Sequence, residues 1–337
     1  MGFMYCLTGV TGFVGREVAA QLREQGCAVR GLVRRPPDPP LPEGVETVMG
    51  DVLDPPALDR LLAGKEEKVL LHAAAAISVR RRNAACERVN VAGTANVLAA
   101  CRRQGVRRLV HFGSVDALPP AGGQPRCEPD RFEPEALPTA YGRSKAQAAQ
   151  LVLEAIREGG LDATVLLPSA IVGPGDYHGG LITQMLRIYL AGLPPVSVAG
   201  GYDFVDVRDV AAAALAAARQ EAVSSCYLVT GRYADITEVF DTLAAHLGRH
   251  PTRWTLPLGA LYPVLPPVTL AYRLAGREPP LTYDALRLMA SHPAYCHDRA
   301  ARELHHQPRP LPQTLTDAAD FLMAQRRAGL PSEGLTP

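Results

Sequence analysis

The chain has 337 residues, of which 47% are hydrophobic and 20% are charged, a balance typical of a globular protein with a large buried core. Its 35 basic and 34 acidic residues leave a net charge of +1, so overall charge attracts neither nucleic acid nor an anionic membrane. The seven cysteines are scattered and form no CxxC pair, which predicts a reduced, cytoplasmic protein with no disulfide framework and no bound metal.

Short β-branched runs alternate with amphipathic stretches through the first half of the chain. This alternation predicts parallel βαβ units, and therefore an α/β fold built on a Rossmann-like, doubly wound parallel sheet. The expected strands are Met4–Thr8, Ala28–Val33, Val45–Met49, Val69–His72, Arg108–Phe112 and Ala163–Leu167. The expected helices are Gly12–Gln25, Pro55–Leu62, Arg82–Gln104 and Ala140–Gly159.

The pattern becomes less regular after Pro168. We expect residues 1–168 to form a dinucleotide-binding core that carries the catalytic residues, and residues 169–327 to form a smaller, discontinuous substrate-binding lobe interleaved with the last strands. Residues 328–337 are expected to be disordered. Four prolines interrupt the apolar stretch Thr255–Tyr272, which predicts buried or pocket-covering helices and no integral membrane segment. Peripheral membrane contact is the alternative.

Three glycines, spaced GxxGxxG, follow the first expected strand and begin the first helix. Glycine is needed where the chain turns sharply and where backbone approaches a pyrophosphate, whose charge the N–H groups of a helix N-terminus bind. The spacing resembles that of the short-chain dehydrogenase/reductase superfamily, which implies a nicotinamide dinucleotide. The predicted contacts are Thr8, Gly9, Thr11, Gly12, Phe13, Val14 and Gly15.

The end of the second expected strand indicates the cofactor. Dinucleotide folds that bind NAD place an acidic residue here, on the ribose 2′-hydroxyl. This chain instead has Arg34 and Arg35, and a guanidinium suits a 2′-phosphate. NADP(H) is therefore favoured, with NAD(H) as the alternative.

The resemblance implies further cofactor contacts. Asp51 and Val52 lie in what looks like the adenine-side turn of the family, with Asp51 accepting from the adenine amino group. His72, Ala73 and Ala74 resemble the small-residue stretch along the cofactor, although the sequence gives His72 no catalytic role. Pro168 and Ser169, at the end of the sixth strand, complete the predicted set.

Tyr141 and Lys145 are the clearest catalytic candidates. Four positions apart on a helix, their side chains lie on one face, one turn apart. A tyrosine can exchange a proton with a substrate oxygen near neutral pH when nearby positive charge lowers its pKa. Lys145 and an oxidised nicotinamide would supply that charge, and in the family this lysine also holds the nicotinamide ribose, so both residues are predicted cofactor contacts too.

Two further residues match the catalytic set of the family. Ser114 follows the fifth expected strand, at the edge where ligands bind in doubly wound sheets, and by resemblance it binds the substrate oxygen beside Tyr141. Asn90 matches the fourth member, which supports a water-linked proton relay behind the lysine; a purely structural helix asparagine is the alternative.

The length and the segments Pro168–Tyr177 and Phe204–Ala211 resemble the extended branch of the family, over residues 4–325. Tyr202 stands where sugar-nucleotide enzymes of that branch carry a diphosphate-binding arginine. Val115 and Asp116 stand where the dehydratases carry an acid pair, so one of the two acids is missing. The resemblance is therefore to dihydroflavonol 4-reductases and 3β-hydroxysteroid dehydrogenases. The predicted substrate contacts are Asp116, Tyr177, Tyr202 and Phe204.

These features predict an oxidoreductase that interconverts a carbonyl and a secondary alcohol on a mostly apolar small molecule. Two alternatives stay open: a sugar-nucleotide or hopanoid-associated sugar epimerase, and a catalytically silent NADP(H) sensor. The resemblance also suggests a homodimer formed through helices 82–104 and 140–159.

Overall fold

The computed structural model describes residues 3–78, 83–119, 124–192, 196–252, 254–263, 265–274, 286, 289 and 294–328. Most of the tail expected to be disordered, residues 329–337, lies outside this set, as does Arg82 at the start of an expected helix.

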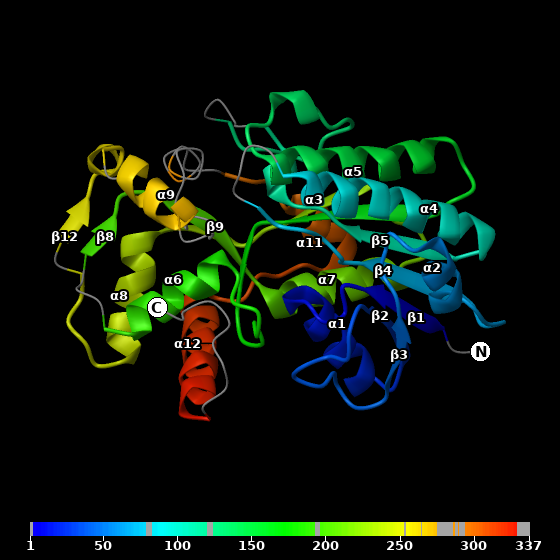
Figure 1. The fold of residues 1–337 in the computed structure, drawn as a ribbon, viewed down its shortest axis with the longest axis horizontal. Coiled ribbons are helices and arrows are strands. Elements are labelled where there is room, and N and C mark those ends of the chain that lie inside the picture. The colour runs from blue at the N-terminus through cyan, green and yellow to red at the C-terminus, as the bar shows by residue number, and fades with distance from the viewer. Residues whose placement is uncertain are drawn as a thin grey trace.

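A seven-stranded parallel sheet forms the larger part of the molecule (Figure 1). Its order is β10-β6-β5-β4-β1-β2-β3, so the chain moves outward in one direction from β1 and then in the other from β4. In doubly wound sheets ligands bind where the strand order reverses, which here is at the carboxyl ends of β1 and β4. The strands are β1 (Met4–Thr8), β2 (Ala28–Val33), β3 (Val45–Met49), β4 (Lys68–His72), β5 (Arg108–Phe112), β6 (Ala163–Pro168) and β10 (Cys226–Val229).

Helices cover both faces of this sheet, and every residue of β4, β5, β6 and β10 is buried. Continuous burial is expected of parallel strands that lie between two helical layers. One layer consists of α1 (Phe13–Glu24), α7 (Val207–Arg219) and α11 (Asp298–Leu304); the other consists of α2 (Pro55–Leu61), α4 (Gly93–Arg103) and α5 (Ala140–Arg157). The predicted α/β fold with a doubly wound parallel sheet is confirmed.

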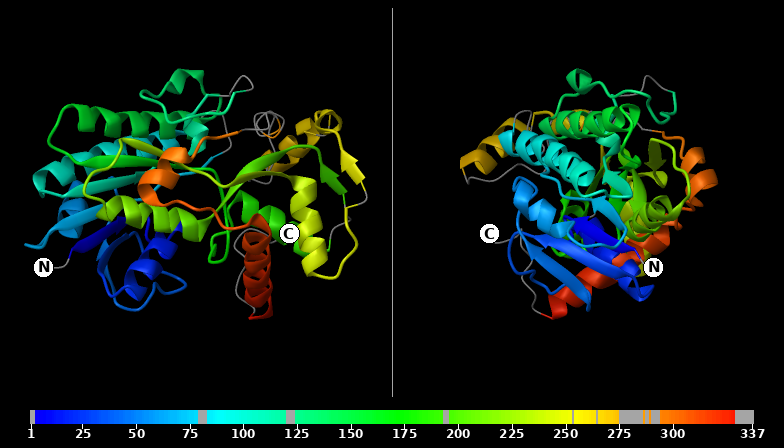
Figure 2. Two further views of the ribbon diagram at one scale, coloured as in Figure 1. Left: turned by 180° about the vertical axis from the view of Figure 1, so that it is seen from behind. Right: turned by 90° about the vertical axis from the view of Figure 1, so that its right-hand side faces the viewer.

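A smaller lobe has its own apolar core and two small sheets. The chain enters it after β6, returns to the large sheet for α7 and β10, and enters it again; from behind, orange α11 lies with the large sheet and red α12 with the lobe (Figure 2). The lobe strands are β7 (Ala170–Val172), β8 (Val196–Val198), β9 (Gly201–Asp206), β11 (Arg232–Asp235) and β12 (Trp254–Leu256). Its helices are α6 (Leu181–Leu190), α8 (Ile236–His246), α9 (Leu265–Leu274) and α12 (Leu311–Arg327).

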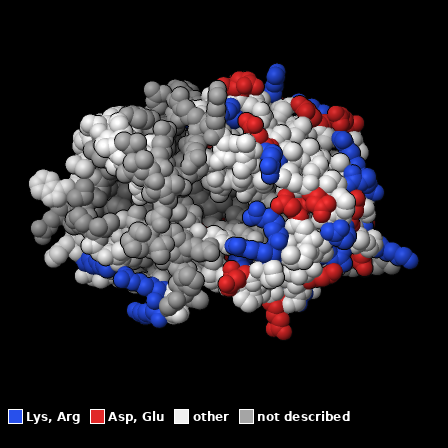
Figure 3. Space-filling model, in the orientation of Figure 1, with Lys and Arg blue, Asp and Glu red and all other residues white. Residues whose placement is uncertain are grey.

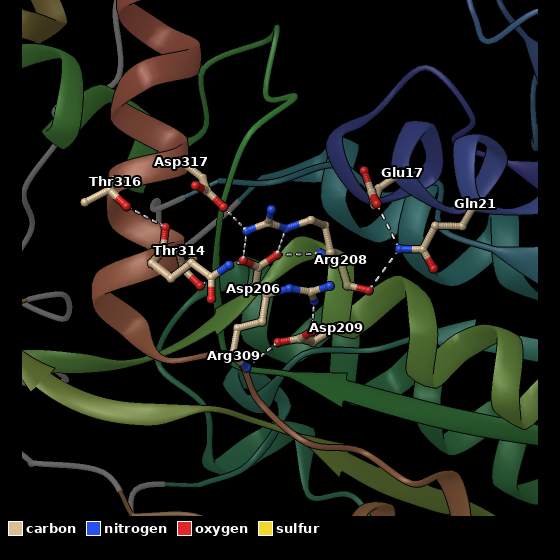
Figure 4. A network of polar contacts seen from close by, with 10 residues as sticks. Glu17, Gln21, Asp206, Arg208, Asp209, Arg309, Thr314, Thr316 and Asp317 are labelled. Atoms are coloured by element: carbon tan, nitrogen blue, oxygen red, sulfur yellow. Dashed lines mark hydrogen bonds and ion pairs between the residues drawn. The ribbon is translucent and has the colours of Figure 1, made fainter. Parts of the chain in front are cut away.

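Charged residues join the lobe to the large sheet where β9 continues into α7 (Figure 4). The Asp206 carboxylate caps α7 by accepting from the Arg208 N–H at 2.8 Å, and it also accepts from the Thr314 hydroxyl of α12 at 2.8 Å. The Arg208 guanidinium pairs with Asp206 at 2.6 Å and with Asp317 of α12 at 2.8 Å. The segment that suggested the extended branch thus fastens the C-terminal helix.

Two local predictions were right only in part. The expected helix over 82–104 is divided into α3 (Ala84–Cys86), a π-helical turn at Glu87–Ala92, and α4. The π turn directs the Asn90 amide toward Ala76, and the following Gly93 packs closely on Val52. The apolar stretch from Thr255 begins inside strand β12, which pairs with β8, and its Leu256 and Tyr262 are 40% and 37% exposed.

On the face shown in Figure 3, acidic and basic side chains are interspersed over the sheet domain. No helix in the described part of the chain has the length and apolar character needed to cross a membrane.

Candidate active site

The glycine turn between β1 and α1 packs directly against the end of β4. Gly9 has a φ of +71°, and a Cβ there would lie 2.5 Å from the Ala74 nitrogen. A Cβ on Gly15 would lie 2.1 Å from the Gly9 oxygen. No side chain caps α1 at Gly12, so its first-turn N–H groups are free to bind an anion. These glycines therefore fit a dinucleotide pyrophosphate.

Residues predicted to contact the cofactor flank this turn. Arg34 and Arg35 follow β2 and are exposed; within the described ranges neither forms a hydrogen bond or an ion pair. Asp51 accepts from the Leu53 N–H at 2.9 Å, and Val52 is buried under Gly93. Both arginines are therefore free to meet a 2′-phosphate.

The last cofactor contacts expected from the sequence line the same edge of the sheet. Thr8 and Ser169 are buried, Ala73 donates to the Thr8 oxygen at 3.1 Å, and Ser169 donates its N–H to Val229 at 3.4 Å. Phe13 and Val14 begin α1, and Pro168 ends β6.

Arg16 was missed by the sequence analysis. Its buried guanidinium donates to Thr11 at 3.1 Å, to Pro40 at 2.9 Å and to Pro39, so it fastens the proline-rich crossover to the glycine turn. The guanidinium also lies 5.1 Å from the centre of the Tyr177 ring. The structure therefore places Tyr177, a predicted substrate contact, beside the glycine turn.

A chain of hydrogen bonds between buried side chains runs beneath the site. His72 bonds to Thr8 at 2.6 Å through Nδ1 and to Thr94 at 3.0 Å through Nε2, and the Thr94 hydroxyl donates to the main-chain carbonyl of Asn90 at 2.6 Å. The Asn90 amide donates to the Ser144 hydroxyl at 2.9 Å. Burial lowers the pKa of His72 to about 3, so it is neutral and structural.

The side-chain hydrogen bonds of Asn90 hold Ala76 and Ser144 in place. Its amide also donates to Ala76 at 2.9 Å and its oxygen accepts from the Ala76 N–H at 2.7 Å. Through Ser144, which donates to the Tyr141 carbonyl at 2.9 Å, Asn90 is connected to the catalytic helix. Within the described residues it makes no direct contact with Lys145, and the proton relay stays a prediction.

Tyr141 and Lys145 lie in the first two turns of α5, which begins where the Thr139 hydroxyl accepts from the Gly142 N–H at 3.0 Å. The buried Lys145 ammonium donates to the Phe112 carbonyl at 2.5 Å, at the carboxyl end of β5. Burial lowers the pKa of Lys145 to about 8. The helix thus carries both groups to the edge where the glycine turn lies.

Together, burial and the side chains around Tyr141 raise its pKa. Burial is the largest effect and raises the pKa of this phenol, the Asp116 carboxylate raises it further, and the Ser114 hydroxyl lowers it by a smaller amount. The sequence analysis expected Lys145 and an oxidised nicotinamide together to lower this pKa; the residues of the chain itself act in the opposite direction. Tyr141 is therefore held as a neutral phenol.

Ser114 and Asp116 form a short turn against the start of α5. The Ser114 hydroxyl accepts from the Asp116 N–H at 3.1 Å, and a Cβ on Gly142 would lie 2.7 Å from the Asp116 oxygen. Burial raises the pKa of Asp116, against the opposing effects of Ser114 and of Arg126. Glycine after Tyr141 therefore allows the turn and the helix to meet closely.

Of the other predicted substrate contacts, the structure brings only Tyr202 toward Asp116. Burial and the Asp116 carboxylate raise the pKa of Tyr202 to about 12. Phe204 is 2% exposed and belongs to the apolar core of the lobe. Arg126 and Tyr295, which no motif had indicated, join this group. In the described ranges, no cluster of His, Cys, Asp and Glu residues suits a metal ion.

Known proteins are similar to this chain over most of its length. A family model described as "NAD dependent epimerase/dehydratase family" matches residues 5–229. The "Sterol demethylase protein B" of Methylococcus capsulatus is 33% identical over 309 residues, covering 88% of this chain and 92% of that protein. A "Putative dihydroflavonol 4-reductase" of Synechocystis is 30% identical over 337 residues, covering 95% of each. The crystal structure of gox2253 has a TM-score of 0.81 and 32% identity, covering 97% of this chain and 98% of that one.

Proposed function

The chain belongs to the NAD-dependent epimerase/dehydratase family and is an NAD(P)-dependent oxidoreductase, and we propose that it uses NADP(H) to interconvert a carbonyl and a secondary alcohol on a mostly apolar small molecule. The observation that carries this proposal is the position of Tyr141 and Lys145. Helix α5 presents both at the carboxyl edge of the parallel sheet, where the glycine turn and Ser114 also lie.

Each residue of the site has a distinct role in this proposal. The hydroxyls of Ser114 and Tyr141 bind the substrate oxygen, and Tyr141, held as a phenol by burial, donates a proton to that oxygen during reduction. The bound nicotinamide supplies or accepts the hydride. Lys145 is fixed by the Phe112 carbonyl, and its ammonium stabilises the phenolate that forms.

The glycine turn, Asp51 and the two arginines after β2 would hold the cofactor. Preference for NADP(H) rests on Arg34 and Arg35, exposed at the place where an acidic residue would bind a ribose hydroxyl. Two guanidiniums that have no bonding partner among the described residues suit a 2′-phosphate, because charge-assisted bonds to phosphate are strong and directional.

An apolar substrate is supported by two observations. The similar proteins are named for a sterol and for a dihydroflavonol. Tyr202, which is half-buried and feels the Asp116 charge, also stands, by the resemblance of the sequence, where sugar-nucleotide enzymes of the family carry a diphosphate-binding arginine. Arginine at that place would have favoured the sugar-nucleotide epimerase. We further propose that the protein is a cytoplasmic homodimer.

The direct test is a screen of hydroxysteroids, aromatic ketones and sugar nucleotides with NADP(H) and NAD(H), followed at the nicotinamide absorbance band. Stoichiometric cofactor consumption with a steroid or aromatic ketone is the expected result. Sugar turnover with no net change in cofactor would establish the epimerase instead. Tight NADPH binding with no turnover across the panel would establish the silent sensor.

A further inference from the structure

Arg126 lies in the loop that leads from β5 to α5 and is held there by main-chain pairing. Its N–H donates to Ala294 at 3.0 Å, and its carbonyl accepts from the Cys296 N–H at 2.8 Å. The guanidinium lies 5.5 Å from the centre of the Tyr295 ring. Two segments far apart in sequence therefore fix one arginine at the substrate end of the site.

One nitrogen of this guanidinium is buried without a hydrogen-bond partner in the part of the molecule that the structure describes. Arg126 is 9% exposed, and its Nε atom is buried with no hydrogen-bond partner. Asp116 is the obvious counterion, yet within the described chain no Arg126 nitrogen comes within 4.0 Å of a carboxylate oxygen. Arginine cannot lose its proton to escape burial, so an unpaired guanidinium is costly unless a ligand completes it.

Charge effects link Arg126 to the residues around Tyr141. Its positive charge acts on Asp116 and on Tyr295, and the Asp116 carboxylate acts in turn on Tyr141 and Tyr202. Asp116 is placed by its N–H bond to the Ser114 hydroxyl and by contact with Gly142. A substrate held by Ser114 and Tyr141 would therefore lie beside Asp116, where the positive charge of Arg126 also acts.

We propose that Arg126 binds a carboxylate of the substrate, so that the enzyme acts on an apolar molecule carrying both a reacting carbonyl or alcohol and one carboxylate. This inference rests on the proposed function for the position of the reacting oxygen. A planar guanidinium binds a carboxylate through two parallel hydrogen bonds. A phosphate dianion suits the site less well, because the Asp116 carboxylate is close and the Lys145 ammonium is already bound to Phe112.

The test compares acids with their neutral esters. The three isomers of acetylbenzoate and their methyl esters are reduced with NADPH by the wild type, by Arg126→Met and by Arg126→Lys. Arg131→Met is the matched control, since Arg131 is exposed in the same loop. Benzoate is also titrated calorimetrically into each protein, which measures carboxylate binding without turnover.

We expect the wild type to favour at least one acid over its ester by about tenfold or more in kcat/KM. Arg126→Met should lower kcat/KM for that acid by about 100-fold and leave its ester nearly unchanged, as expected for removal of a buried charge partner. Arg126→Lys keeps the positive charge but cannot form two parallel hydrogen bonds, so its kcat/KM for that acid should lie between the values for the wild type and Arg126→Met. Arg131→Met should behave as wild type.

Equal efficiency for acids and esters in the wild type would overturn the proposal and leave the proposed function standing. Equal losses for both in the two Arg126 variants would show a structural role and also overturn it. If no ketone is reduced, the proposed function fails, and the benzoate titration alone tests whether Arg126 binds a carboxylate. A carboxylate site is supported if the wild type binds benzoate and Arg126→Met does not. If the methionine variant does not fold, the same comparison is made with Arg126→Lys. No benzoate binding by the wild type, or equal binding by wild type and variant, refutes the carboxylate site.

Discussion

Lys145→Met should separate the stability of the fold from its activity. The substitution replaces a buried ammonium, 4% exposed, by an apolar side chain of similar length. Burial lowers the pKa of Lys145 from 10.5 to about 8. At about 1.36 kcal/mol per pKa unit, this corresponds to roughly 3 kcal/mol that the charged lysine costs the folded state. Losing the hydrogen bond to Phe112 offsets about 1 kcal/mol.

The net expectation at pH 7 is a variant more stable by about 2 kcal/mol, or roughly 3 °C in Tm for a chain of this length. Its advantage depends on pH. Because the folded-state pKa of about 8 lies below the unfolded value of 10.5, only the unfolded chain binds the proton between these values. Wild-type stability therefore rises with pH through this window. The destabilisation caused by the buried charged lysine is fully present below the folded-state pKa of about 8 and absent above the unfolded-state pKa of 10.5.

Thermal unfolding of wild type, Lys145→Met and the exposed control Lys65→Met at pH 7 and about pH 10 measures this difference. Lys145→Met should melt above wild type at pH 7, lose most of that advantage at the higher pH, and have no carbonyl reductase activity. Lys65→Met should follow wild type throughout. A lower Tm for Lys145→Met at pH 7, or a gap that does not change with pH, would refute the reasoning.

Three further predictions concern the cofactor and the residues around Tyr141. Ser114→Ala should lower kcat/KM about 100-fold with little change in NADPH affinity, because it removes a hydroxyl from the substrate oxygen; an unchanged kcat/KM would exclude that contact. Replacing Arg34 and Arg35 together with glutamine should weaken NADPH binding by about tenfold or more and NADH binding hardly at all, as fluorescence titration would show, whereas equal losses would remove the 2′-phosphate argument. Asn90→Ala should lower stability by about 3 kcal/mol in denaturant unfolding, because Ser144 and Ala76 lose buried partners. A lower kcat at unchanged stability would favour the proton relay instead.

The parts of the site that the sequence predicted are local. The glycine spacing after β1 and the four-residue separation of Tyr141 and Lys145 are short patterns whose geometry follows from one turn or one helix. Short β-branched runs likewise predicted six of the seven strands of the large sheet, because a buried strand needs little beyond its own composition. Strand β10 was not predicted, because the chain reaches it only after a passage through the smaller lobe.

The parts that could not be predicted depend on distant contacts. The π turn at Glu87–Ala92 follows from bonds that Asn90 makes to Ala76 and Ser144, which no periodicity contains. Arg126 reaches the site only through pairing with residues near Tyr295. Aromatic character alone suggested Phe204 as a substrate contact. Phe204 is instead 2% exposed and lies in the apolar core of the lobe, with its ring centre 6.1 Å from that of Tyr202, so only contacts distant in sequence decide that it is core.

Proton donation by residue 141 is tested most directly by a single-turnover experiment. Wild type and Tyr141→Phe are loaded with NADPH, mixed with a ketone that the screen identifies, and followed by nicotinamide absorbance. The account predicts that Tyr141→Phe binds NADPH as tightly as wild type and loses about a thousandfold or more of the rate. A variant that oxidises NADPH at the wild-type rate would contradict it, since no phenol would then be needed at the substrate oxygen.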